Sequence, residues 1–134
     1  MRTFTVLCAL ALASCSAVGP TSRLSREIGT EIFEDVPSPA AARYDDAGGR
    51  SFSFQGPAYR CGRFVFSIEG TVEEAASFYR GTMTQPPYSW TLTNEKMDGA
   101  VLVLSFEKGE DRCVVQIDRR KDHVQVVARV NYRG

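Results

Sequence analysis

Residues 100–132 read AVLVLSFEKGEDRCVVQIDRRKDHVQVVARVNY, and apolar side chains occupy every second position in three successive runs. Successive residues of a β-strand point to opposite faces, so each run predicts a strand with one buried face. Polar turns at 108–111 and 119–122 separate the runs and predict hairpins. The side chains expected to face the core are Ala100, Leu102, Leu104 and Phe106, then Cys113, Val115 and Ile117, then Val124, Val126, Ala128, Val130 and Tyr132.

One amphipathic helix is expected before these strands. Thr71 and Glu74 have the spacing of a capping box, in which each side chain binds the other residue's backbone amide. Gly81 and the Pro86-Pro87 pair mark the end of the segment. Trp90 follows, either as a core anchor beneath the helix or as part of a recognition edge with that proline pair. The apolar stripe of the helix consists of Val72, Ala75, Ala76, Tyr79 and Met83.

Further alternating segments predict strands at 51–55, 63–69 and 88–93, with a turn at 94–99. Clean alternation is typical of antiparallel sheets that bury one face and expose the other. The predicted fold class is therefore α+β, with one helix packed on a curled antiparallel sheet of about five strands in the order β-α-β-β-β-β. The segment at 51–55 adds a short extra N-terminal strand.

The N-terminus has the layout of a secretory leader, with an apolar run over 4–13 that is too short to cross a bilayer. The segment Leu12-Ala13-Ser14-Cys15 closes that run and resembles the lipobox of bacterial lipoproteins. The resemblance implies cleavage before Cys15 and lipid on its sulfur, which would hold the chain at a membrane. Ser16 replaces the Asp that retains enteric lipoproteins in the inner membrane, which implies the outer membrane, facing the periplasm. The alternatives are an ordinary secretory signal and a buried N-terminal strand.

The chain is expected to have three regions: a signal peptide over 1–14, a lipid-anchored flexible tether over 15–49 and a small α+β domain over 50–134. Proline and glycine punctuate the tether, which argues against continuous regular structure there. Apolar residues with helical spacing also make residues 22–34 compatible with a short amphipathic helix. Such a helix would dock on a partner or pack loosely on the domain.

Composition limits the function classes. The 16 basic residues equal the 16 acidic ones, so the chain has no basic excess for binding nucleic acid. His123 is the only histidine, and Cys113 with His123 lacks the third group of a nucleophile–base arrangement. The paired carboxylates fall at the helix start or in turns, where no catalysis is needed to explain them. We therefore expect no enzyme activity, no metal site and no cofactor.

Two further sets of residues are candidate sites. Arg119, Arg120 and Lys121 form the densest basic cluster, which either contacts anionic headgroups or an acidic polymer or is a solvated turn. Cys61 and Cys113 are the cysteines left after the leader and its lipid site. The oxidising compartment that the leader implies favours a disulfide between them. The alternative is two buried free thiols, which pack as small apolar residues.

Several short motifs of the body occur in a recognisable order: Val36-Pro37-Ser38-Pro39, Phe78-Tyr79 with Met83, Trp90-Thr91-Leu92, Leu104-Ser105-Phe106-Glu107-Lys108 and Cys113-Val114-Val115. In that order they resemble small uncharacterised bacterial envelope proteins, a domain family without an assigned activity, over about residues 36–132. With the leader, the resemblance implies a non-catalytic envelope lipoprotein that is a binding or scaffolding module for an envelope protein or polymer. The alternative is a carrier of a small ligand or lipid, with its pocket between helix and sheet.

Overall fold

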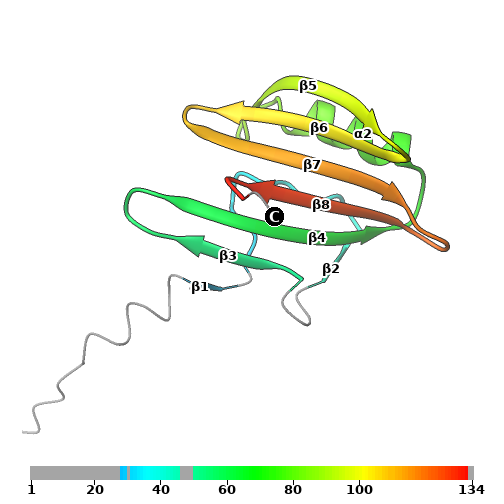
Figure 1. Cartoon of the computed structure of the whole chain (residues 1–134), viewed down its shortest axis with the longest axis horizontal. Coiled ribbons are helices and arrows are strands. Elements are labelled where there is room, and N and C mark those ends of the chain that lie inside the picture. Colours follow the sequence, from blue (N-terminus) through cyan, green and yellow to red (C-terminus); the bar gives the residue numbers. More distant parts are fainter. Residues whose placement is uncertain (1–27, 30, 46–49, 133–134) are drawn as a thin grey trace, which may run out of the picture.

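The computed structural model describes residues 28–29, 31–45 and 50–132, so the predicted leader and Cys15 lie outside the described residues. These residues form one helix and one antiparallel sheet (Figure 1). The predicted α+β class is thereby confirmed, whereas the expected number and order of strands are wrong. The elements are β1 (Ile28–Gly29), β2 (Arg43–Tyr44), β3 (Phe52–Gln55), β4 (Arg60–Ile68), α2 (Val72–Thr82), β5 (Thr91–Asp98), β6 (Val101–Lys108), β7 (Asp111–Arg119) and β8 (Val124–Val130).

The sheet order is β1-β3-β4-β8-β7-β6-β5, with β2 also beside β4. Strands β5 to β8 form a meander in which each strand pairs with the next, as the sequence predicts. Gly99 and Gly109 have φ values of 62° and 61° at the hairpin turns, a conformation that glycine adopts without strain. Strand β5 continues to Asp98, so the turn consists of Gly99 and Ala100. It is therefore shorter than the turn expected over 94–99.

The long-range step of the fold is the pairing of β4 with β8. Gly62 lies opposite Val130 at one end of this pair, and Ile68 lies opposite Val124 at the other. The edge of β4 that faces away from β8 pairs with two short strands. Strand β3 pairs with the first part of β4, and β2 pairs with its last part. Strand β8 therefore separates β4, which carries Cys61, from β7, which carries Cys113.

Helix α2 begins at the predicted capping box. Thr71 Oγ1 accepts a hydrogen bond from the Glu74 amide at 3.1 Å, and the Thr71 amide donates to Glu74 Oε2 at 2.8 Å. Gly81 lies inside the helix, which ends one residue later than that glycine, at Thr82. The helix covers β6, β7 and β8 on one side of the sheet, here called the inner face (Figure 1).

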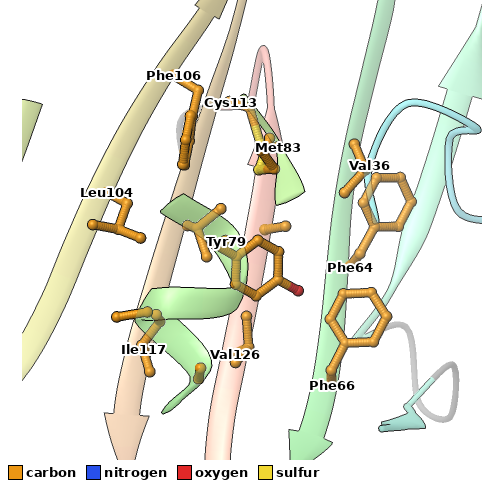
Figure 2. Close-up of a cluster of buried hydrophobic side chains, with 14 of the residues drawn as sticks. Val36, Phe64, Phe66, Tyr79, Met83, Leu104, Phe106, Cys113, Ile117 and Val126 are labelled. Atoms are coloured by element: carbon orange, nitrogen blue, oxygen red, sulfur yellow. The ribbon is translucent and has the colours of Figure 1, made fainter. Parts of the chain in front are cut away.

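The space between α2 and the inner face is filled by side chains (Figure 2). Tyr79 and Met83 of the helix segment have no exposed surface, and neither do Leu104, Phe106 and Ile117 on the strands beneath them. Protein interiors packed in this way hold few voids larger than a water molecule. The helix-facing half of the inner face is therefore a hydrophobic core.

Residues 31–45 cover the other half of the inner face, over β4. Phe33 and Val36 are 6% and 3% exposed, and the Phe33 ring meets the Phe64 ring edge-on with 5.1 Å between centroids. A Cβ atom at position 62 would lie 2.7 Å from the Phe64 ring and 3.1 Å from that of Phe33. Gly62 thus makes room for both rings within a strand whose register is regular on both sides.

This packing corrects the predicted domain boundary. The flexible tether expected over 15–49 is wrong for residues 31–45, which belong to the folded domain, and for β1, which pairs with β3. The amphipathic helix considered for residues 22–34 is also wrong where the structure describes that range, because β1 is a strand. Apolar side chains that the segment adds to the core are Phe33 and Val36, with Ile32, Ala42 and Tyr44 packed against them.

Candidate functional site

Cys61 and Cys113 are free thiols. Cys113 lies opposite Val130, which in turn lies opposite Gly62, so the side chain of Cys61 points to the other face of the sheet. Two inter-strand spacings also place the two Cα atoms about 10 Å apart, beyond the ~7 Å that a disulfide can bridge. The predicted disulfide is therefore wrong for this fold, because it assumed that these two strands were neighbours.

We expect a maleimide to label Cys61 in the native protein and Cys113 only after unfolding. Cys61 is half-buried, whereas Cys113 is fully buried. Burial, with a smaller contribution from the Asp35 charge, raises the pKa of the Cys113 thiol to about 12, so almost no reactive thiolate forms at neutral pH. Peptide mapping without reductant measures both labels, and Cys61→Ser is the control. A peptide that links the two cysteines would contradict the observed strand order.

The predicted basic cluster lies at the hairpin between β7 and β8. Arg119 donates to the Gly70 carbonyl oxygen at 2.7 Å, and Arg120 pairs with Asp118 at 3.2 Å. Lys121 is exposed and has no hydrogen-bond or ion-pair partner among the described residues. Two of the three cations are thus bound by neighbouring parts of the fold, as expected of a solvated turn.

His123 lies in the same hairpin, with Nδ1 2.7 Å from a carboxylate oxygen of Asp122. It lines a small cavity of about 310 Å³ together with Arg43 and Glu69. Cys113 lies near the opposite end of β7, so the structure does not bring that thiol to the imidazole. These residues therefore do not form a nucleophile–base pair.

Arg60 organises a cluster of charges at the start of β4. Its guanidinium binds both carboxylate oxygens of Asp35 at 2.8 Å and reaches Asp111 at 2.7 Å. Lys108 Nζ lies 3.2 Å from Asp35. Burial alone would raise the pKa of Asp35, but hydrogen bonds and charges from Arg60 and Lys108 lower it below its usual value. Two cations and two carboxylates satisfy one another here, which is the arrangement of a structural cluster.

Trp90 belongs to the same structural cluster. Its indole Nε1 donates to the Asp35 carbonyl oxygen at 2.7 Å, and the side chain is 2% exposed. Arg60 and Lys108 lie 5.9 Å and 5.7 Å from its ring centroid, within the range of cation–π contacts. The interpretation of Trp90 as a core anchor is therefore confirmed, and the residue anchors the 31–45 segment as well as the strands.

The face of the sheet opposite α2 is here called the outer face. It carries two arginines that have no acidic partner within residues 28–29, 31–45 and 50–132. Arg63 on β4 lies directly opposite Arg129 on β8, and both are half-buried. The Nε atom of each is buried and has no hydrogen-bond partner among the described residues. Arg129 Nη1 donates to Gln116 Oε1. Burial lowers the pKa of Arg129, and the charge of Arg63 lowers it further.

Arg129 also lines a pocket of about 690 Å³ at one end of the outer face. This volume falls within the range of small-molecule sites. Arg63 stands opposite Arg129 but does not itself line the cavity. We call the cavity, together with this neighbouring arginine, the outer arginine pocket. Side chains that line it include Tyr59, Glu110, Arg112, Val114 and Tyr132.

Asn131 shapes this end of the sheet. Its Nδ2 donates to the Arg60 carbonyl oxygen at 3.0 Å, and its Oδ1 accepts from the Arg112 amide at 2.9 Å. A φ of 51° at Asn131 turns the chain after β8. The Tyr132 ring consequently meets the Phe52 ring edge-on on the outer face, with centroids 5.0 Å apart. This contact corrects the expectation that Tyr132 faces the core.

The outer arginine pocket was not among the sites predicted from the sequence. Arg63 and Arg129 occupy polar positions of alternating strands, which predicts only that they leave the core. Their contact depends on the register between β4 and β8, which no local pattern specifies. One hint was present in the sequence: both arginines stand at outward positions within apolar strands rather than in turns.

Comparisons with protein-family models, with curated proteins and with solved structures find no match. The resemblance to small envelope proteins therefore stays an expectation. Within residues 28–29, 31–45 and 50–132, no three His, Cys, Asp or Glu side chains gather as metal ligands. No helix in the described part of the chain has the length and apolar character needed to cross a membrane.

Proposed function

We propose that the chain is a non-catalytic lipoprotein of the bacterial cell envelope, held by lipid on Cys15 at the periplasmic side of the outer membrane. Its folded domain is a binding module for an envelope protein or polymer, and it binds through the outer face of its sheet. The single observation that supports the binding part is the outer arginine pocket, where Arg63 and Arg129 lie side by side and the described residues offer neither of them a carboxylate partner. The anchoring part rests on the lipobox resemblance of Leu12-Ala13-Ser14-Cys15.

A carrier with its pocket between helix and sheet receives less support. That space is occupied by fully buried side chains, among them Tyr79, Phe106 and Ile117. A lipid or small ligand would need to displace them, and each displaced large side chain costs several kcal/mol of packing, roughly 3–5 for an aromatic one. The outer face offers a preformed pocket instead.

The open edge of the sheet at β5 is a weaker candidate for binding a partner strand. The strand has a register shift between Leu92 and Asn94, and it exposes Lys96 and Asp98. Bulges and charged side chains on an edge strand oppose the addition of another strand. We therefore place the binding surface on the outer face rather than on this edge.

Cys15→Ala is expected to release the protein from membranes. Without the thiol no diacylglyceryl group can be attached, and the anchoring energy of two or more acyl chains is lost. Cell fractionation with intact-mass measurement checks this expectation, and Cys61→Ser serves as the matched control because it removes a thiol of the folded domain. Membrane partitioning at unchanged mass in Cys15→Ala cells would disprove the anchor.

A photo-crosslinker on the outer face is expected to capture the partner in cells. The photoreactive amino acid p-benzoylphenylalanine at Arg112 would stand exposed beside the outer arginine pocket. The same amino acid at Ser77, exposed on α2 on the opposite side of the molecule, is the control. We expect a discrete adduct from position 112 and none from position 77, read by immunoblot and mass spectrometry. Adducts from position 77 alone would move the binding surface to the helix side.

A further inference from the structure

The opposed arginines of the outer face lack a compensating charge. Like charges that face each other directly across neighbouring strands destabilise a sheet. Arg63 has no hydrogen bond or ion pair among the described residues, and Arg129 has only its bond to Gln116. A buried guanidinium nitrogen without a partner carries a further desolvation cost. An anion placed between the two side chains would relieve both costs.

The carboxylates around the outer arginine pocket do not supply that anion. Asp111 is already bound by Arg60 at 2.7 Å and by the side chain of Asn131. Glu110 is exposed, lies in the β6–β7 turn and makes no ion pair with either arginine. Arg112, at the rim, pairs with the exposed Glu107 at 3.2 Å and with no other carboxylate in the described part of the chain. Among the described residues, no carboxylate therefore compensates Arg129, which lines the cavity, or Arg63, which stands opposite it.

We propose that the outer arginine pocket binds a phosphate group, carried by a molecule whose remaining part packs against Tyr59 and Tyr132. The proposal rests on the proposed function, in which the outer face is the binding surface. Guanidinium groups present planar forks of donors that match phosphate oxygens. A phosphate spreads its oxygens tetrahedrally, so it accepts from two arginines that approach from neighbouring strands. A carboxylate has two oxygens in one plane and is matched by a single fork.

The size and walls of the pocket determine what accompanies the phosphate. About 690 Å³ exceeds what one phosphate group fills. Tyr59 and Tyr132 are 55% and 37% exposed and offer aromatic surface next to Arg129. Apolar or cyclic groups pack on such rings. The ligand class is therefore a phosphate ester with a ring or short apolar part, which describes both a soluble phosphate ester and a phospholipid headgroup.

Isothermal titration calorimetry on the full-length chain in a non-ionic detergent tests the proposal with three probes. These are inorganic phosphate, phenyl phosphate and dihexanoyl phosphatidylglycerol below its micelle concentration. We expect phenyl phosphate to bind more tightly than inorganic phosphate, because its ring packs on the tyrosines. Binding of the glycerolipid as well assigns the site to a headgroup, and binding of the first two alone assigns it to a soluble ester. No heat from any probe up to ~10 mM would overturn the proposal.

Arg63→Gln is the decisive variant, and Lys121→Gln is its matched control. Losing one charge-assisted contact should weaken phenyl phosphate binding about tenfold or more, whereas Lys121→Gln removes a remote exposed cation and should leave binding unchanged. Arg63→Gln should also unfold at a higher temperature than the unmodified protein when no ligand is present, because the repulsion with Arg129 is gone. Unchanged affinity in Arg63→Gln would overturn the proposal. Binding of these probes in solution does not require the lipid anchor. A failure of Cys15→Ala to release the protein from membranes can therefore be distinguished from a failure of phosphate binding.

Discussion

A chain that begins at Arg50 is expected to fail to fold cooperatively, although the sequence pattern predicted only a flexible tether over 15–49. Truncation removes Phe33 and Val36 from the core. It also uncovers the ring of Phe64, which Phe33 contacts, and that of Phe66, which Tyr44 contacts. Deleting one buried phenylalanine side chain alone costs roughly 3–5 kcal/mol. Domains of this size are stable by about 5–15 kcal/mol in total. The loss is therefore comparable to the whole stability of the domain.

Thermal unfolding followed by circular dichroism compares this chain with one that begins at Ile28 and keeps every contact described above. We expect a sharp transition for residues 28–134 and a broad or absent one for residues 50–134. The double variant Phe33→Ala/Val36→Ala of the longer chain separates lost packing from lost length, and it should unfold at least 10 °C lower. A sharp transition for both chains at similar temperatures would show that the 31–45 segment is dispensable.

Local patterns in the sequence predicted the parts of the fold that local physics controls. The three runs after residue 100 became β6, β7 and β8, because strict alternation and short turns leave one way to form a meander. The capping box at Thr71 and Glu74 marked the start of α2, because its two hydrogen bonds join residues three apart. These features need no information from distant residues.

The 31–45 segment could not be recognised in the same way. Val36 is an isolated apolar residue among prolines, and the helical spacing of the apolar residues over 22–34 indicated a helix where the structure has strand β1 and, at Phe33, a loop. Phe33 and Val36 are buried because Gly62 leaves space beside Phe64 and because Asp35 binds Arg60. Gly62 and Arg60 both belong to β4, which comes later in the chain. Such complementarity is visible only after β4 has been placed.

The two cysteines and the two arginines depend on the same long-range step. Placing β8 between β4 and β7 separates Cys61 from Cys113 and brings Arg63 next to Arg129. Shifting a strand register by one residue exchanges the faces of all its side chains. The candidate site therefore follows from strand pairing that hairpin rules do not determine, whereas the polar character of its positions did follow from alternation.

Asp35→Ala is expected to lower the free energy of unfolding by about 2–4 kcal/mol, because it leaves a largely buried arginine short of its main partner. The Arg60 and Asp35 side chains are only 20% and 17% exposed. Asp111 would remain as a partner of Arg60, so we expect the variant to be less stable but still folded. Urea denaturation at neutral pH measures the change, and Glu107→Ala is the control. The Glu107 pair with Arg112 is exposed on both sides, so its removal should cost less than about 1 kcal/mol.

The effect of Asp35→Ala should also depend on pH in a defined direction. The pKa of Asp35 is lowered in the folded state, so its stabilising effect is fully present above the unfolded-state pKa of about 3.9 and is lost as pH falls through the folded-state value. The unmodified protein should therefore lose stability more steeply than Asp35→Ala below about pH 4, and the two curves should converge there. Two outcomes would show that Asp35 does not hold Arg60 and the 31–45 segment in place. One is that the stability curves of the two proteins stay parallel down to the acid transition. The other is that Asp35→Ala lowers the free energy of unfolding at neutral pH no more than Glu107→Ala does.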